Sequence, residues 1–421
     1  MTVRILVVTN HFWPENFRIN DLAFWLAERR HDVTVLTGVP NYPAGRFFPG
    51  YGIFKRRFES HRGVKIKRFP LIPRGKGRGW NVALDYLSSA LMSCLLAPFY
   101  CRGRYDLVFV FETSPFTIGL PALVIKRQQS IPLIFWVLDL WPESLSATGA
   151  IRSPTLLEWA RRIVRFIYAR CDCLLVSSRG FRKSVMATGG YQGEIGYFPN
   201  WVEPEYTGNQ KSEAARLPDL PEGFRIMFAG NIGAAQDFET ILQAAEQLKG
   251  EAEIHWVILG DGRRFEWLKS EVVNRGLEGC FHPLGRHPAE MMPAFFARAD
   301  ALLLTLRREP IFALTVPGKL QSYMASGKPV IAGLDGEGAA LVLESGGGLA
   351  CPAESPKELA GKVLEMYRMS QEERELMGAR GRQFCAENFN REKQFKKIEG
   401  MMMDLAGDEN PKTRTPEPGC S

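Results

Sequence analysis

Short apolar runs, spaced at the intervals of alternating strands and helices, constrain this chain more than any other feature of its sequence. Runs rich in Val, Ile, Leu and Phe lie at residues 3–9, 33–37, 106–111, 132–138 and 172–177. They are nearly continuous rather than alternating, which predicts strands buried on both faces of a parallel sheet. The rhythm begins again with runs at 225–229, 254–259, 301–306, 329–332 and 348–351. The sequence therefore predicts two doubly wound α/β domains in tandem.

The domain organisation follows from length and from one proline-containing segment. A chain of 421 residues favours two domains, and residues 197–204 carry two prolines at a plausible junction. We expect an N-terminal Rossmann-like domain at 1–202 and a C-terminal one at 203–385. A helix at 386–406 is expected to pack back on the N-terminal domain. The polar, proline-containing tail at 407–421 is expected to be disordered.

Cysteine and histidine usage excludes some classes of site. None of the eight cysteines forms a CxxC pair, which favours buried reduced thiols and a cytoplasmic protein. The six histidines show no metal-ligand spacing, so we expect no metal site. The N-terminus leads directly into an apolar run, which does not resemble a secretory signal.

Positive charge is concentrated in one stretch of the chain. The net charge is +7, and residues 55–78 hold ten Lys or Arg and one acid, Glu59. Such a stretch suits an anionic membrane surface, a nucleic acid or a phosphorylated substrate. It contains no nucleic-acid recognition motif, so we expect no nucleic-acid partner.

An apolar helix is predicted over residues 82–99, between this stretch and Arg102 and Arg104. The strand at 106–111 follows too soon for a chain that has crossed a bilayer. Two interpretations remain open: a buried core helix, or a helix partly embedded in the membrane interface. The flanking charge supports the second, and we expect residues 55–104 to contact the inner membrane surface.

Two loops of the N-terminal half carry candidate reactive groups. Residues 10–18 follow the first strand without a GxGxxG pattern, so nicotinamide or flavin binding is not expected there. Arg18 lies near a helix start, where it could meet an anion; alternatively Asn16 caps the helix and Arg18 is solvated. Asp139 ends a buried strand, and Glu143 follows four residues later. Asp139 could hold or deprotonate a hydroxyl, or it could simply cap a helix.

The C-terminal half carries glycine turns and basic residues typical of a phosphate site. One turn contains Gly230, Asn231 and Gly233, and a second contains Gly260, Arg263 and Arg264. Glycines let the backbone approach a phosphate, and the arginines could reach a diphosphate. Lys319 lies in the first turn of a helix, which the helix dipole disfavours unless an anion is bound.

Several motifs then resemble one family. The pattern Pro-x-Lys-(x)3-Tyr-Met-Ala-x-Gly-Lys-Pro-Val at 317–330 resembles family-4 glycosyltransferases of the GT-B fold. The segments 11–21, 38–45, 139–144 and 317–323 resemble the WbuB-type subgroup, which is associated with fucosamine-type transfer in O-antigen and capsule synthesis. The resemblance covers essentially the whole chain up to the tail.

The resemblance implies two domains facing a cleft and metal-independent transfer with retention at the anomeric carbon. No cofactor is expected, and the nucleotide-sugar is the donor substrate. The residues implied in catalysis are Asp139, Lys319 and Arg18. Those implied in donor binding are Gly230, Asn231, Gly233, Gly260, Arg263, Arg264, Pro317, Gln321, Ser322, Glu337 and Gly338. Those implied in acceptor binding are Asn16, Tyr42 and Glu143.

The chain departs from the wider family at its usual sugar and diphosphate contacts. Leu314 and Ser322 replace a glutamate pair, Asn231 and Gln236 replace an Arg and a Lys, and Leu138 replaces a histidine. Residues Gln321, Ser322 and Glu337 are expected to substitute for the missing contacts.

The expected function is transfer of an N-acetylated amino- or deoxyhexose, such as N-acetylfucosamine, from a UDP-sugar. The expected acceptor is a polyprenyl-diphosphate-linked saccharide at the inner face of the cell membrane, in surface-polysaccharide synthesis. Two alternatives remain open. One is a nucleotide-sugar 2-epimerase of the same architecture, and the other is a non-catalytic carbohydrate-binding subunit.

Overall fold

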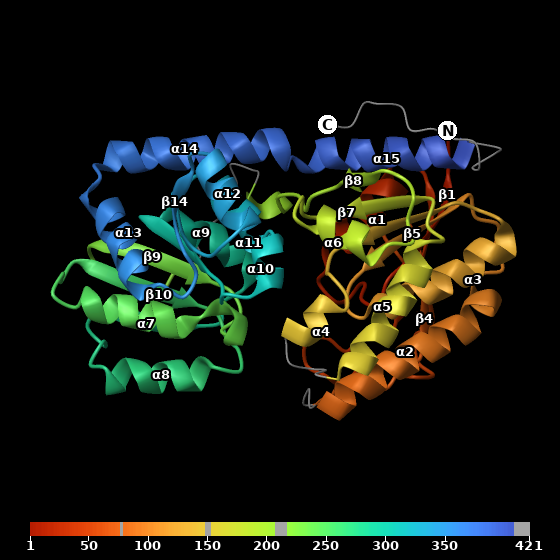
Figure 1. The fold of residues 1–421 in the computed structure, drawn as a ribbon, viewed down its shortest axis with the longest axis horizontal. Helices are drawn as coiled ribbons and strands as arrows, with labels where there is room; N and C mark the ends of the chain where they lie inside the picture. Colours follow the sequence, from red (N-terminus) through yellow and green to blue (C-terminus); the bar gives the residue numbers. More distant parts are fainter. Residues whose placement is uncertain (76–78, 148–152, 207–216, 408–421) are drawn as a thin grey trace. The chain divides into compact units, whose positions relative to one another are not determined.

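A computed structural model describes residues 1–75, 79–147, 153–206 and 217–407. The chain forms two compact units (Figure 1). The N-terminal unit comprises residues 1–198 together with the chain from Phe395 onward, and the C-terminal unit comprises residues 199–394. The predicted tail at 407–421 lies, apart from Gly407, outside the described residues.

The N-terminal unit is built on an eight-stranded sheet in the order β3-β4-β2-β1-β5-β6-β7-β8. Its strands are β1 (Arg4–Val8), β2 (Asp32–Gly38), β3 (Phe58–His61), β4 (Val64–Phe69), β5 (Leu107–Glu112), β6 (Leu133–Val137), β7 (Cys173–Val176) and β8 (Ile195–Tyr197). Only β3 pairs antiparallel, with β4, among these neighbouring strands. Every residue of β5 and of β6 is buried, as the continuous apolar runs predict.

Helices connect these strands and cover the sheet (Figure 1). They are α1 (Arg18–Glu28), α2 (Gly79–Tyr100), α3 (Gly119–Gln129), α4 (Glu143–Ala147), α5 (Pro154–Tyr168) and α6 (Phe181–Thr188), joined by α15 (Arg391–Gly407) from the end of the chain. Contacts tie α15 to this unit: the rings of Trp25 and Phe395 lie 5.3 Å apart, and His31 Nε2 lies 2.9 Å from Glu399 Oε1.

The C-terminal unit has a six-stranded, all-parallel sheet in the order β11-β10-β9-β12-β13-β14. Its strands are β9 (Phe224–Ala229), β10 (Ile254–Leu259), β11 (Phe281–Gly285), β12 (Ala301–Thr305), β13 (Val330–Gly333) and β14 (Gly348–Cys351). Its helices are α7 (Phe238–Gln247), α8 (Phe265–Asn274), α9 (Met292–Ala297), α10 (Pro310–Leu314), α11 (Gly318–Ala325), α12 (Glu337–Glu344), α13 (Pro356–Arg368) and α14 (Gln371–Asn388). Both sheets confirm the predicted doubly wound α/β class.

Each sheet has a point where the order of its strands reverses. In the N-terminal unit the chain winds outward from β1 through β2, and then restarts on the other side with β5. In the C-terminal unit the same reversal separates β9 from β12. Doubly wound sheets bind ligands at the carboxyl ends of the strands that flank this point. The loops after β1, β5, β9 and β12 are therefore expected to carry the functional residues.

The basic stretch at 55–78 is not the open positive patch that the sequence predicts. It forms the β3–β4 hairpin, in which Lys65 pairs with Asp32 and Arg62 pairs with Glu28. Arg68 is fully buried and donates to Glu59 Oε1 at 2.6 Å. Arg68 is therefore neutralised inside the unit, while Arg62 and Lys65 form ion pairs at its surface. Lys76 and Arg78 lie outside the described residues.

Candidate functional site

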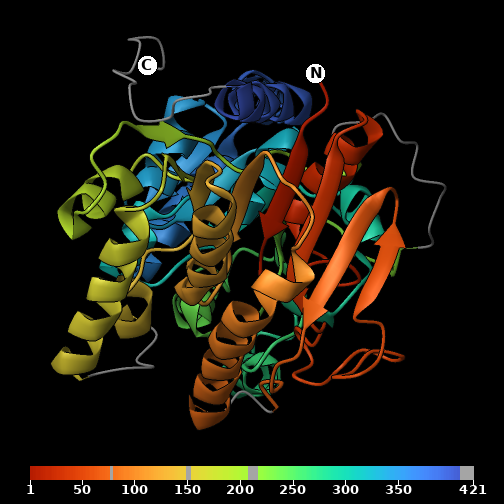
Figure 2. The same cartoon turned by 90° about the vertical axis from the view of Figure 1, so that its right-hand side faces the viewer.

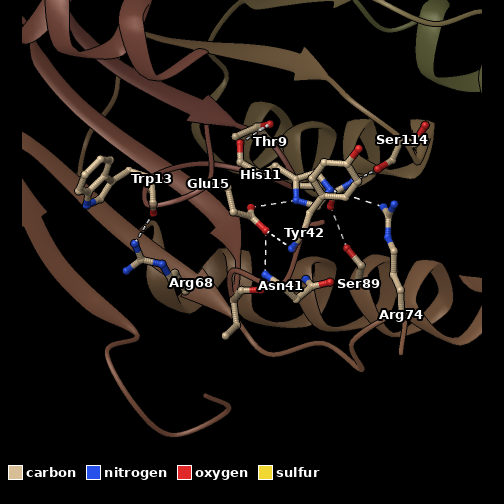
Figure 3. A network of polar contacts seen from close by, with 12 residues as sticks. Thr9, His11, Trp13, Glu15, Asn41, Tyr42, Arg68, Arg74, Ser89 and Ser114 are labelled. Atoms are coloured by element: carbon tan, nitrogen blue, oxygen red, sulfur yellow. Dashed lines mark hydrogen bonds and ion pairs between the residues drawn. The ribbon is translucent and has the colours of Figure 1, made fainter. Parts of the chain in front are cut away.

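The loop after β1 is held by one buried carboxylate, that of Glu15 (Figure 3). Glu15 Oε1 accepts hydrogen bonds from the backbone amides of Asn41 and Tyr42, at 2.7 and 2.6 Å. Its other oxygen lies 2.9 Å from Nδ1 of His11. Charge-assisted bonds of this kind are about twice as strong as neutral ones. Glu15 thus joins the loops that follow β1 and β2 at the sheet's carboxyl edge.

His11 continues this network toward α2 (Figure 3). Its Nε2 lies 3.5 Å from Nη2 of Arg74, and Arg74 Nε donates to Asp85 Oδ2 at 2.8 Å. A neutral imidazole that donates from Nδ1 to Glu15 and accepts at Nε2 satisfies both contacts. Burial raises the pKa of Asp85, and the bond from Arg74 opposes that shift. These side chains line a small cavity with Asn10 and Ser114.

Asp139 lies at the other side of the switch point. The hydroxyl of Ser114 lies 3.5 Å from Asp139 Oδ2, and Ser144 donates to Oδ1. Burial raises the pKa of Asp139. Below it, Glu112 at the end of β5 accepts hydrogen bonds from the backbone amides of Leu138 and Asp139, at 3.1 and 3.4 Å. Burial raises the pKa of Glu112 far above its usual value, and the charge of Asp139 adds to this shift.

The structure brings together only some of the residues predicted for the N-terminal half. Tyr42 packs against His11, with ring centroids 5.4 Å apart, so it belongs to the cluster. Asn16 is exposed and does not cap α1, whose N-cap is Phe17. Arg18 begins α1, and Glu143 begins α4, where each side chain is half-buried.

In the C-terminal unit, glycine loops meet at the carboxyl edge of the sheet. The amide of Gly230 donates to Leu259 O at 2.8 Å, and the amide of Gly260 donates to Gly285 O at 2.7 Å. A side chain on Gly260, at φ +144°, would place its Cβ 1.8 Å from Gly230 O. Only glycine fits there, because the two loops touch through their backbones. The result is a bare backbone surface after β9 and β10, of the kind that admits phosphates.

Lys319 points at this surface from the first turn of α11. A Cβ on Gly230 would lie 2.6 Å from Lys319 Nζ, and the amine lies 3.8 Å from the centroid of the Phe228 ring. Nζ is buried, and it has no hydrogen-bond partner in the described part of the chain. Burial lowers the pKa of Lys319 to about 7. The amine of Lys319 is therefore buried and not exposed, because the aliphatic part of the side chain extends from α11 to the glycine loop.

Tyr323 fixes the direction from which this lysine comes. Its hydroxyl accepts from the amide of Ala229 at 2.7 Å and donates to the carbonyl oxygen of the same residue at 3.0 Å. These two bonds tie α11 to the last residue of β9, one residue before Gly230. Lys319, one helical turn earlier on α11, is held against the loop as a consequence.

The structure separates the other predicted donor residues into two groups. Asn231 and Arg263 are exposed beside the glycine loops, and Arg264 stacks over Trp267 at 3.6 Å. Gln321 and Ser322, in contrast, lie on the buried face of α11. The hydroxyl of Ser322 donates to Glu203 Oε2 at 2.5 Å, so it supports the packing of α11. Both residues are buried in the unit, and their donor role stays a prediction.

The remaining predicted donor residues lie in the turn after β9 and around the starts of α11 and α12. Gly233 donates its amide to Gln236 Oε1 at 3.2 Å, which closes the turn after β9. Glu337 is the first residue of α12, and Gly338 is buried against Pro317, whose Cδ would lie 3.1 Å from a Cβ on that glycine. Gly338 and Pro317 thus bring the start of α12 onto the start of α11.

Comparison with known proteins supplies the identity that geometry alone does not. The family "Glycosyl transferases group 1" matches residues 223–369, and the family "Glycosyl transferase 4-like domain" matches residues 16–201. A probable glycosyltransferase WbjE from Pseudomonas aeruginosa is 26% identical over 276 residues, which cover 64% of this chain and 68% of that protein. The chain is a group 1 glycosyltransferase.

Two further similarities agree with this assignment. A putative colanic acid biosynthesis glycosyl transferase, WcaI of Escherichia coli K12, is 25% identical over 340 residues, which cover 77% of this chain and 82% of that protein. The structure of Anabaena Alr3699/HepE in complex with UDP-glucose superposes with a TM-score of 0.67 at 16% identity, covering 96% of this chain and 100% of that one. This glycosyltransferase therefore has the GT-B fold, as the resemblance implies.

Sequence reasoning misses several residues that build the sites of this glycosyltransferase. The motifs do not single out Glu15 and His11 as a pair, although their spacing of four residues is visible in the sequence. Glu112 is also not singled out, although an acid is unusual at the end of a continuous apolar strand and could have indicated a site. Arg307 follows β12 at the second switch point, and its amide donates to Ala235 O at 2.9 Å.

Proposed function

We propose that this glycosyltransferase binds the diphosphate of a nucleotide-sugar at the Gly230 and Gly260 loops, with Lys319 as the principal positive charge. The observation that carries the proposal is the buried amine of Lys319, which has no hydrogen-bond partner among the described residues and lies against a bare backbone loop. A buried ammonium without a counter-charge is costly. A diphosphate oxygen beside Nζ would remove that cost and restore the positive charge of the lysine.

We propose that the acceptor hydroxyl is bound by the N-terminal unit, at the carboxyl edge that carries Asp139 and the His11–Arg74 pair. In the reaction the bond between the anomeric carbon and the diphosphate oxygen breaks, and a bond to the acceptor oxygen forms. The proton of the acceptor hydroxyl leaves with the nucleoside diphosphate. Lys319 would stabilise the departing diphosphate without a divalent cation, and the anomeric configuration would be retained, as the family resemblance implies.

The substrates are proposed from the relatives. The structural neighbour was solved with UDP-glucose, which supports a UDP-linked donor. A relative described as a colanic acid biosynthesis enzyme supports a role in surface-polysaccharide synthesis. We propose an N-acetylated amino- or deoxyhexose, such as N-acetylfucosamine, as the sugar, because the resemblance to the WbuB-type subgroup implies it. The proposed acceptor is a polyprenyl-diphosphate-linked saccharide at the cytoplasmic face of the membrane.

Thermal-shift measurements with UDP-, GDP- and dTDP-sugars test the donor site, because a ligand that binds only the folded state raises the melting temperature. We expect UDP-sugars to raise it in the wild type and in Lys328→Met, but not in Lys319→Met. Lys328 is a matched control, because it is a second partly buried lysine of the same unit whose pKa is also lowered by burial. An equal shift in all three proteins would refute the role of Lys319.

Product analysis tests the reaction class. We expect transfer only when a lipid-linked saccharide is added, with retained configuration at the anomeric carbon and with full activity in EDTA. NMR of UDP-N-acetylhexosamine incubated without an acceptor provides the contrary outcome. If the 2-epimer accumulates there, the protein is an isomerase. If the donor binds but neither product forms with any lipid-linked acceptor, the proposed transfer reaction is wrong.

A further inference from the structure

Helix α2 buries its polar face and exposes its apolar face. Its fully buried residues are Asp85, Ser89, Ser93 and Ala97, which recur every four residues along one face. Its exposed face carries six large apolar side chains that are between 38% and 69% exposed, namely Trp80, Leu84, Leu87, Leu91, Leu95 and Phe99. A helix on the surface of a protein in water normally has the opposite arrangement, with its apolar side facing the core. The pattern of α2 suits a helix whose outer face meets an apolar medium.

The polar residues on the inner face have partners within the N-terminal unit. Asp85 accepts from Arg74 at 2.8 Å, and Ser89 donates to Asn10 Oδ1 at 2.9 Å. The same face lines the small cavity beside His11. The buried side of α2 is thus committed to the polar cluster of this unit. Its apolar side chains cannot turn inward without breaking these bonds.

The topology shows that α2 does not cross a bilayer. It is the one helix within the described residues that is long and apolar enough to do so, and it has 22 residues, or about 33 Å of helix. However, the chain enters α2 from β4 and leaves it into β5, and both strands belong to one sheet. Its stripe also extends over the full length of the helix. Such a helix lies along a membrane surface.

Helix α5 carries a second exposed apolar set on the same side of the unit. Leu156, Trp159 and Phe166 are each about half exposed. Both views place the amino-terminal ends of α2 and α5 at the same edge of the N-terminal unit (Figures 1 and 2). The two helices therefore begin at one edge of the unit, and each carries exposed apolar side chains.

Positive charge accompanies both apolar faces. On α5, Arg162 lies over the Trp159 ring at 5.7 Å, and the nearby Arg170 lies over the Phe166 ring at 3.7 Å. Beyond the end of α2, Arg102 lies over the Phe99 ring at 5.4 Å. An apolar side chain with an arginine beside it matches the boundary between acyl chains and anionic headgroups. This pairing of charge and apolarity selects an anionic lipid surface over an apolar protein partner.

We propose that the outer faces of α2 and α5 both insert into the interfacial layer of an anionic lipid bilayer. The N-terminal unit then rests on the membrane with the polar cluster around His11 directly behind α2. This proposal goes beyond the glycosyl-transfer reaction and does not depend on it, since lipid binding is measured without donor or acceptor.

Co-sedimentation of the full chain with vesicles tests the proposal. Vesicles of phosphatidylethanolamine with phosphatidylglycerol are compared with phosphatidylcholine vesicles, at low and high salt. We expect binding to the anionic vesicles that weakens with salt. The triple variant Leu87→Gln/Leu91→Gln/Leu95→Gln should lower the partition coefficient roughly tenfold or more.

A matched control is available in the C-terminal unit. Leu343 on α12 and Leu376 on α14 are 60% and 55% exposed, so Leu343→Gln/Leu376→Gln removes similar apolar surface elsewhere. We expect this variant to bind vesicles within twofold of the wild type. All the changed leucines are exposed, so melting temperatures should stay unchanged.

Three outcomes would overturn the proposal. The first is no binding to anionic vesicles at low salt. The second is equal loss of binding in the triple variant and in the control. The third is a lipid-free dimer, detected by sedimentation velocity, that the triple variant dissociates while vesicle binding is absent. In that last case a second copy of the chain, and not lipid, covers α2.

Discussion

The two units place their polar residues at the same edge of similar sheets, but they neutralise them differently. In the N-terminal unit, the buried carboxylates have protein partners: Glu15 accepts from two backbone amides and contacts His11, and Asp85 is paired with Arg74. In the C-terminal unit, the buried amine of Lys319 lies against a glycine loop with no such partner among the described residues.

This difference separates the Glu15 network, whose charges have protein partners, from the amine of Lys319. A satisfied polar network is rigid and holds its loops in place without a ligand. A buried, unpaired lysine is instead a local cost that an anion relieves. Under the proposed function, the Glu15 network would orient a neutral acceptor hydroxyl, and Lys319 would gain stability from a diphosphate.

Replacing Lys319 should give the largest effect. We expect Lys319→Met to lower kcat/KM by about 10²- to 10³-fold, because it removes the charge that stabilises the leaving diphosphate. The same change should leave the free energy of unfolding of the unliganded protein equal or higher, because it removes a buried polar group without a partner. Steady-state kinetics and thermal denaturation measure the two quantities. A loss of both activity and stability would contradict the contrast between the units.

Breaking the N-terminal network should cost stability. We expect Glu15→Ala to lower the free energy of unfolding by roughly 2–4 kcal/mol, because two backbone amides and His11 lose a buried charged partner. Glu143→Ala, at the half-buried start of α4, should change it by less than about 1 kcal/mol. Urea denaturation monitored by circular dichroism compares the two. Equal effects would show that Glu15 does not hold the loops.

The pH dependence of donor binding sharpens the comparison further. The pKa of Lys319 is lowered to about 7, so the free enzyme at pH 8 has mostly neutral lysine. Binding of a UDP-sugar should restore the charge, with uptake of about one proton, and affinity should fall by roughly tenfold per pH unit above the pKa. Isothermal titration calorimetry in buffers of different ionisation enthalpy measures the uptake. Lys319→Met should show none.

Replacing Glu112 should give the smallest effect, at pH 5, and this effect should grow as the pH rises. Its pKa is raised by burial, so the folded state keeps a proton that the unfolded state releases, and the wild type loses stability as pH rises above the ordinary value. Glu112→Gln mimics the protonated form and lacks this slope. We expect it to be within about 1 kcal/mol of the wild type at pH 5 and to gain on it toward pH 8. A constant difference across this range would mean that Glu112 is ionised in the fold.

The sequence predicts most of the central strands but misses β3, β4, β8 and β11 at or near the sheet edges. Continuous apolar runs identify the central strands, because strands buried on both faces admit few polar residues. Strand β4 escapes this rule: Val64 and Ile66 face inward while Lys65 and Lys67 face out, so the stretch reads as a basic cluster. The outward-facing Lys65 pairs with Asp32 on the neighbouring strand β2, and Arg62, in the turn before β4, pairs with Glu28 on α1.

Local sequence patterns identify only some residues of the two candidate sites. Lys319, Gly230 and Asp139 stand at positions that motif and strand ends reveal. The burial of Ser322 and Gln321 could not be predicted from the motif, because the motif gives their place in sequence while the helical repeat turns them inward. Glu15 and Glu112 act through backbone amides of other loops. These amides are distant in sequence from the two glutamates, so no local pattern predicts the hydrogen bonds between them.

Helix α2 is also the covalent link between β4 and β5, and this has a practical consequence. A peripheral enzyme that is anchored by an appended tail is freed from lipid by proteolysis or truncation. In the proposed docking, the lipid-facing surface is the helix that connects two strands of one sheet, so excising it would open the fold. A detergent-free form of this enzyme must therefore be sought by replacing outward-facing leucines, with the backbone left whole.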